Sequence, residues 1–172
     1  QSGPLGTAGA DRVVLSPDAF QRLTAQGRRV VVTHELTHVA TRATTSAHLP
    51  PWLSEGFAEY VAWGPVSMPV QTASAQLLAQ VRTEGPPLTL PSPSDFDSAR
   101  AGLATAYQGA WLAVRRIAAE HGEPGLMAFY RAVAGAPGTP AQTADEAFGT
   151  VLGTTTQAFV EGWRDELEAL AR

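Results

Sequence analysis

The sequence predicts a mainly α fold with a small β element, an α+β domain whose body is made of helices. Apolar residues recur at helical spacing along most of the chain, and clusters of proline and glycine separate these segments. Residues 12–16 are rich in β-forming side chains and are expected to form the one strand. A chain of 172 residues can bury about two-thirds of its unfolded surface without a disulfide. We therefore expect residues 1–10 to be a flexible lead-in and residues 11–172 to form a single domain.

The charge of the chain argues against a nucleic-acid partner. The formal net charge is −4, the isoelectric point is near 5.5, and the twelve basic residues, all arginine, are scattered along the sequence. No apolar run reaches about 18 residues, so we expect no transmembrane segment. The chain starts at Gln1 without an initiator methionine, which suggests a trimmed or mature segment.

The first expected elements are a strand and a short helix. Three consecutive apolar residues, two of them β-branched, favour a strand over residues 12–16. Ser16 followed by Pro17 favours the start of a short helix, because serine caps helix N-termini and proline fits their first turn.

The next helix carries two histidines at the spacing of a metal site. We expect it over residues 28–42, beginning after Gly27. His34 and His38 project from one helix face and can hold one zinc ion. Glu35 lies about a quarter-turn round the helix from His34, where a carboxylate can act as general base on a metal-bound water. The opposite face is apolar and is expected to pack into the core: Val32, Leu36 and Val39.

A catalytic zinc site needs a third protein ligand, and the following helix offers one. Two prolines lead into a helix over residues 52–63, which begins Trp-Leu-Ser-Glu-Gly-Phe-Ala-Glu-Tyr. Together with His-Glu-Leu-Thr-His, this stretch resembles the gluzincins, the zinc peptidases that include thermolysin-like enzymes and zinc aminopeptidases. The resemblance covers about residues 12–122. It implies Glu55 as the third ligand, a compact gluzincin-like catalytic domain with the zinc site between two helices, and a cleft strand at residues 12–15.

Glu59 is expected to support one of the histidine ligands. It lies one turn after Glu55, so its carboxylate can accept a hydrogen bond from a zinc-bound imidazole, as a carboxylate does at this position in thermolysin-like enzymes. A solvated acidic face is the alternative interpretation. His48, in the loop before this helix, could approach the site, although a lone loop histidine is more often solvated.

Other zinc-peptidase clans fit the sequence less well. The metzincin pattern requires glycine at position 41 and histidine at position 44, where this chain has Thr41 and Thr44. An aspartate ligand could come from the Gly162-to-Asp165 spacing, but that segment lies far away in a terminal helix. The rest of the chain is expected to be helical, over residues 71–82, 97–120, 124–133, 143–152 and 156–171.

Tyr107 is the candidate for a second catalytic group. Peptide hydrolysis places negative charge on the carbonyl oxygen, which calls for a hydrogen-bond donor opposite Glu35. The sequence Ala-Tyr-Gln-Gly at residues 106–109 resembles the neighbourhood of the tyrosine that supplies this donor in zinc aminopeptidases. Core packing is the alternative for this ring. The rival residues are His121, beside a glycine at a helix end, and Tyr60 and Tyr130, which are expected to face elsewhere.

The sequence therefore predicts zinc-dependent hydrolysis of peptide or protein substrates, with one zinc per chain. Residues 1–33 lack the Gly-x-Met-Glu-Asn stretch by which zinc aminopeptidases hold the substrate's amino terminus, so we favour an endopeptidase. The alternatives are a zinc-binding pseudopeptidase or regulatory module without turnover, and a metal-free helical interaction domain. Absence of lysine and asparagine suggests a GC-rich bacterial gene, and absence of cysteine agrees with an extracytoplasmic or secreted location.

Overall fold

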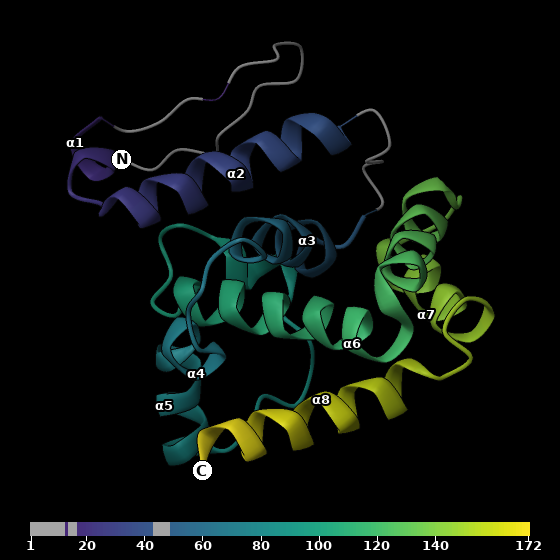
Figure 1. The fold of residues 1–172 in the computed structure, drawn as a ribbon. Helices are drawn as coiled ribbons and strands as arrows, with labels where there is room; N and C mark the ends of the chain where they lie inside the picture. The colour runs from purple at the N-terminus through teal and green to yellow at the C-terminus, as the bar shows by residue number, and fades with distance from the viewer. Residues whose placement is uncertain (1–12, 14–16, 43–48) are drawn as a thin grey trace.

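The helices account for all regular secondary structure in the residues that the computed structural model describes, which are residue 13, residues 17–42 and residues 49–172 (Figure 1). The α-helices are α1 (Pro17–Gln21), α2 (Ala25–Thr41), α3 (Pro51–Trp63), α4 (Val70–Ala73), α5 (Ala75–Glu84), α6 (Leu103–Gly135), α7 (Pro140–Thr150) and α8 (Thr156–Ala171). A short 3-10 helix, η1, spans Pro93–Phe96.

The mainly α prediction is confirmed, but the small β element is wrong. The described residues contain no strand, and Val13, the one described residue of the segment predicted as a strand, has no regular secondary structure. A strand needs a neighbouring strand to satisfy its backbone N–H and C=O groups, and the described chain offers none. Of the cleft strand implied at residues 12–15, only Val13 is described and it is not in a strand; the other three positions lie outside the described residues. Residues 1–10, expected as a lead-in, lie outside the described residues.

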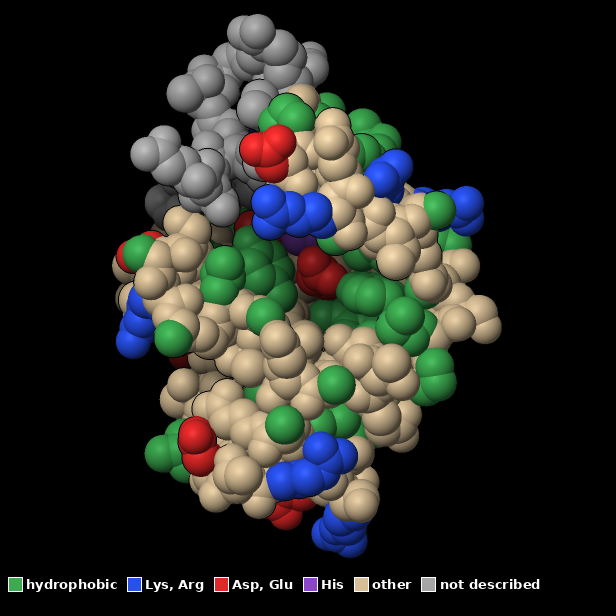
Figure 2. Space-filling view, turned by 90° about the vertical axis from the view of Figure 1, so that its left-hand side faces the viewer, with side chains coloured by type: hydrophobic (Ala, Val, Ile, Leu, Met, Phe, Trp, Pro, Cys, Tyr) green, Lys and Arg blue, Asp and Glu red, His purple; other side chains and the backbone are tan. Residues whose placement is uncertain are grey.

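The helices form layers around a central pair, α3 and α6. In Figure 1, α2 lies across one side of α3, α6 packs on the other side, and α8 runs along the opposite edge. α5 and α7 pack between α6 and α8 at the two ends of the molecule. The left-hand side of Figure 1 is hollowed, with histidine and acidic side chains at the base of the hollow and hydrophobic side chains on either side (Figure 2).

The apolar core lies between α3, α5, α6, α7 and α8. Each of these helices contributes at least one of the largest fully buried side chains. These include Leu53, Leu78, Ile117, Phe129, Phe148 and Trp163. Every one of these side chains is removed from water by helices distant in sequence, which makes the body a single packed unit.

Gly56 allows α3 to lie directly against α6. A Cβ atom at this position would come within 2.7 Å of the Ala110 carbonyl carbon and 2.8 Å of Val114 Cγ2. No real side chain tolerates such approaches to a backbone, so glycine permits the close contact. Glu55 precedes Gly56 directly, and this contact therefore sets where its carboxylate lies relative to the start of α6.

The buried face of α2 differs from the prediction. The three apolar residues expected in the core are half-buried or exposed, and Leu36 is 53% exposed. The buried residues of α2 are instead Val30, His34 and Thr37. Because α2 is an outer layer on α3, the histidine face is itself the inner face.

The helices predicted over residues 97–120 and 124–133 form one kinked helix, α6. Gly122 has a φ of +71°, a left-handed conformation that glycine adopts readily, and Pro124 starts the second half. Although α6 contains 33 residues, neither it nor another described helix is apolar enough over a sufficient length to span a bilayer. The predicted absence of a transmembrane segment is confirmed for the described part of the chain.

Candidate metal centre

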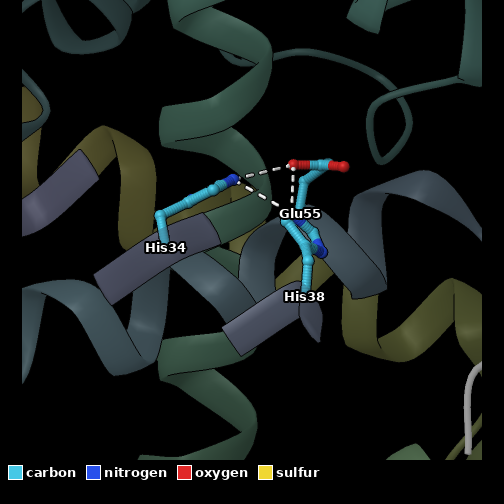
Figure 3. Close-up of side chains that lie close together, drawn as sticks. All are labelled: His34, His38 and Glu55. Carbon is cyan, nitrogen blue, oxygen red and sulfur yellow. Dashed lines mark hydrogen bonds and ion pairs between the residues drawn. The ribbon is translucent and has the colours of Figure 1, made fainter. Parts of the chain in front are cut away.

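Three donor atoms from two helices meet between α2 and α3. Nε2 of His34 lies 3.0 Å from Nε2 of His38, and Oε2 of Glu55 lies 3.2 Å from each of them (Figure 3). The one-turn spacing of the histidines on α2 points both rings at α3, and the Gly56 contact holds Glu55 opposite them. The structure thus brings together the three side chains that the sequence suggested as ligands.

This group could hold a metal ion. Two imidazole nitrogens only 3.0 Å apart can share at most one proton, yet both also face the same carboxylate oxygen. A cation placed among the three atoms would accept a lone pair from each of them. Protons on the two nitrogens cannot satisfy all three contacts at the same time. Among the described residues, no other set of histidines and carboxylates is grouped in this way, and Asp165 on α8 is not part of the group.

The ionisable groups of the site are strongly coupled. Burial by itself lowers the pKa of His34, but contacts with Glu55 and Glu59 and their negative charges outweigh burial and raise this pKa to about 9. Burial by itself raises the pKa of Glu55, but hydrogen bonds and attraction from His34 and His38 outweigh it and lower this pKa to about 2. Without a metal, His34 therefore carries a proton near neutral pH, and a bound metal must displace that proton.

Glu59 lies beside His34 on the side away from the other two ligands. Its Oε1 atom is 3.0 Å from Nδ1 of His34, the distance of an ion pair. Nδ1 is buried, and the direction of its N–H misses this oxygen, so the contact is not a well-aligned hydrogen bond. The predicted proximity of Glu59 to a histidine ligand agrees with this position; the role of Glu59 stays a prediction.

Trp63, which the sequence analysis did not single out, contacts the second oxygen of Glu59. Its indole Nε1–H donates a hydrogen bond of 2.6 Å to Glu59 Oε2. The available signal was spacing, because Glu55, Glu59 and Trp63 follow one another at successive turns of α3.

Tyr107 lies next to His34 at the start of α6. The centroids of the two rings are 5.9 Å apart in a T-shaped arrangement, and Phe96 of η1 packs on Tyr107 at 5.3 Å. Burial, followed by the negative charges of three glutamates, raises the pKa of Tyr107 above its ordinary value. The hydroxyl therefore keeps its proton and can donate a hydrogen bond. The three glutamates are Glu55, Glu59 and Glu35.

The other candidate residues occupy different places. Glu35 is half-buried on α2 and close enough for its charge to act on Tyr107. His121 is exposed fourteen residues further along α6, about 21 Å away at the helical rise per residue, so it cannot serve the same site. Tyr130 is 2% exposed and belongs to the core, as predicted. His48 lies outside the described residues.

A cavity of about 310 Å³ lies beside Glu59 and Tyr107. Its walls are largely aromatic and apolar, formed by Trp63, Ala73, Leu103, Ala104, Gln108 and Trp111. Another cavity, of about 270 Å³, lies around Pro91 and Trp163 and includes no residue of the metal-binding group.

Comparison with known proteins does not assign the chain to a family. No protein-family model, curated protein or solved structure matches it. The resemblance to gluzincins therefore rests on two short motifs, and the structural finding is that His34, His38 and Glu55 form a group that could hold a metal ion.

Proposed function

We propose that this protein is a zinc-dependent endopeptidase that hydrolyses bonds within peptide or protein substrates. The observation that carries the proposal is the close grouping of His34, His38 and Glu55, with Tyr107 against His34 and the charge of Glu35 acting on Tyr107. Peptide hydrolysis requires an activated water, a group that moves its proton and a donor to the developing negative oxygen. With a metal bound, the site would offer a group for each of these requirements.

The separations of the donor atoms suit zinc. Zinc binds nitrogen and oxygen ligands at about 2.0–2.2 Å, so two ligand atoms of a tetrahedral site are about 3.3–3.6 Å apart. The separations here, 3.0, 3.2 and 3.2 Å, are only slightly shorter. Structural zinc sites are closed by four protein ligands, whereas catalytic sites have three and keep one position open. The three-ligand set therefore favours a catalytic site.

When bound, zinc would supply a Lewis acid that lowers the pKa of water and polarises a carbonyl group. Glu35 would take the proton of the attacking water and pass it to the leaving amine. Tyr107 would donate its hydroxyl proton in a hydrogen bond to the substrate oxygen that becomes negative. His34 can ligate only as a neutral ring, whose Nδ1–H would then donate a hydrogen bond to the carboxylate of Glu59, which would fix the ring's orientation.

The cavity beside Glu59 and Tyr107 supports a peptide substrate. Its volume of about 310 Å³ is at the lower end for ligand pockets, enough for one large side chain. Trp63, Trp111 and Leu103 provide apolar walls. We propose that it receives a large apolar or aromatic side chain next to the bond that is cleaved.

Casein hydrolysis tests the proposal. The zinc-loaded protein is expected to cleave casein, a chelator to stop the reaction, and added zinc to restore it. Glu35→Gln should retain zinc and fold but lose nearly all hydrolysis, because an amide cannot take the proton from water. Glu84→Gln, which makes the same change at an exposed position on α5, is the matched control and should keep wild-type activity.

Metal content separates the alternatives. One zinc per chain is expected in wild type, and Glu55→Ala should lose it at ordinary zinc concentrations. A folded, zinc-loaded protein that does not turn over any unfolded substrate would be the pseudopeptidase. A protein that binds no zinc after reconstitution would be a metal-free helical domain.

A further inference from the structure

We infer that Trp63 is a positioning residue of the metal centre, which holds the carboxylate of Glu59 in the orientation that supports His34. The inference rests on the proposed metal-binding function. It assigns a role to an indole N–H that lies outside the ligand set and outside the residues predicted to take part in catalysis.

The carboxylate of Glu59 is held at both oxygens. Oε1 faces Nδ1 of His34 at 3.0 Å, and Oε2 accepts the hydrogen bond of 2.6 Å from Trp63. The terminal torsion of a glutamate has a broad energy minimum, so a carboxylate with one partner can turn easily. The second partner removes this freedom. The side chain of Glu59 is only 18% exposed, and few solvent contacts can replace the indole.

The orientation of Glu59 matters because its carboxylate faces Nδ1 of His34, an atom with no hydrogen-bond partner among the described residues. Nδ1 of His34 is buried, and its contact with Oε1 is already poorly aligned for a hydrogen bond. Further rotation of the carboxylate would also remove this ion-pair contact and leave Nδ1 with neither a hydrogen bond nor an ion pair, which is costly for a buried polar atom. It would also let the ring tilt, and a tilt moves Nε2, the atom that faces His38 and Glu55.

Trp63 is itself fixed by a helix distant in sequence. Its ring packs against Trp111 of α6, with the centroids 5.8 Å apart and the planes at 36°. The indole is also partly buried against the apolar core. The packing of α3 against α6 therefore determines the position of the indole N–H. The N–H in turn orients the carboxylate of Glu59, which faces His34. A merely structural tryptophan would contribute to stability without affecting the metal.

The test is a double-mutant cycle read out by zinc affinity. Competition with a chromophoric chelator gives the zinc dissociation constant of wild type, Trp63→Phe, Glu59→Ala and the double variant. Trp63→Phe keeps an aromatic ring against Trp111 but has no N–H, and it should weaken zinc binding by about tenfold, the lower end for outer-shell changes. In the Glu59→Ala background the same change should have no further effect, because Trp63 acts only through Glu59.

Two results would overturn the inference directly. One is a Trp63→Phe variant with wild-type zinc affinity. The other is an equal loss from Trp63→Phe with and without Glu59, which would make the two effects independent. A wild-type chain that binds no zinc overturns the metal centre and this role together. If wild type binds zinc tightly and Trp63→Phe has the same zinc affinity, only the positioning role of Trp63 is overturned.

Trp52→Phe is the matched control, since Trp52 lies on the same helix about two turns before Glu59. Trp52 is 6% exposed and stacks on Phe148 in the core, so its change should lower the melting temperature and leave zinc affinity unchanged. An equal loss of zinc affinity in Trp52→Phe would show a general loosening of α3 and overturn the inference.

A second measurement does not need a folded Trp63 variant. In the full chain, the indole N–H of Trp63 should exchange slowly with solvent in wild type and faster in Glu59→Ala, as followed by NMR. An indole proton whose exchange rate is the same in both proteins would contradict the hydrogen bond on which the inference depends.

Discussion

The ring of Tyr107 stands at 61° to the ring of His34, with the two centroids 5.9 Å apart. These residues are 73 positions apart in the chain, and they meet because α3 packs on both α2 and α6. The contact places a protonated phenol beside the metal-binding group. The negative charge of Glu35 also acts on this phenol.

Tyr107→Phe should lower kcat by about 100-fold or more, the usual size for loss of one donor to a developing oxyanion. Zinc content and melting temperature should stay nearly unchanged, because the ring contacts with His34 and Phe96 remain. Tyr60→Phe, the same change on α3, is the control and should keep wild-type kcat. A normally folded Tyr107→Phe enzyme with wild-type kcat would assign this ring to packing alone.

Gly56→Ala should lower the free energy of unfolding by about 1–3 kcal/mol or more, as overpacking of a tight contact does. The new methyl group would press on the backbone of Ala110, which cannot move without shifting α6. Denaturant titration measures the loss. Gly64→Ala, at the end of the same helix, is the control, since its Cβ would meet only Tyr60 and Val61 oxygens at 3.5 Å. Equal stability of the two variants would contradict the close contact.

The zinc-free protein should be most stable between about pH 4.5 and 6.5. The pKa of His34 is raised from 6.5 to about 9, so the stabilisation is complete below pH 6.5 and disappears as pH rises through about 9. The pKa of Glu55 is lowered from 4.5 to about 2, so its contribution is complete above pH 4.5 and disappears as pH falls through about 2.

Melting temperatures of chelator-stripped protein check this pH dependence. Wild type should lose stability between pH 6.5 and 9 relative to His34→Gln, which has no titrating ring at this position. A wild-type melting temperature that stays level with that of His34→Gln across this interval would contradict the coupling.

Ala104→Leu should weaken cleavage next to large apolar side chains. Ala104 is exposed at the start of α6 and lines the cavity beside Glu59 and Tyr107, so added methyl groups would fill the cavity without disturbing the core. The ratio of kcat/KM for peptides that differ only in leucine or serine beside the cleaved bond should fall by about 10-fold or more. Ala119→Leu, also exposed on α6 but outside the cavity, should leave the ratio unchanged.

Local spacing made the pairing of His34 and His38 predictable, whereas Glu55 was assigned as a ligand only through the resemblance to gluzincins. His34 and His38 lie on one face of any helix that contains them, because they are four residues apart. The two prolines before Trp52 predict where the helix carrying Glu55 begins. Tyr107 was reached through a resemblance to a short motif, and its position beside His34 agrees with that expectation. Each of these motifs is short in the chain, although the side chains that they bring together come from different helices.

The features that could not be predicted depend on partners far apart in the chain. The β-branched residues near the N-terminus suggested a strand, but a strand requires a neighbour that sequence does not reveal. Leu36 was expected in the core but is exposed, because helical periodicity does not say which face of α2 packs against the other helices. The position of the Trp63 ring could not be predicted because it depends on packing against Trp111, 48 residues later, although the spacing to Glu59 is local.

The placement of α2 as an outer layer has a consequence for local unfolding. His34 and His38 belong to this outer helix, and Glu55 belongs to a helix that packs on the core, so a shared ion would join them. An ion that binds only while α2 is packed on α3 favours the packed state by about 2.7 kcal/mol when free zinc is 100 times the dissociation constant. Amide hydrogens of α2 that exchange through its separation from α3 would then exchange about 100-fold more slowly. The zinc level around the protein would thereby determine how long this helix resists a protease.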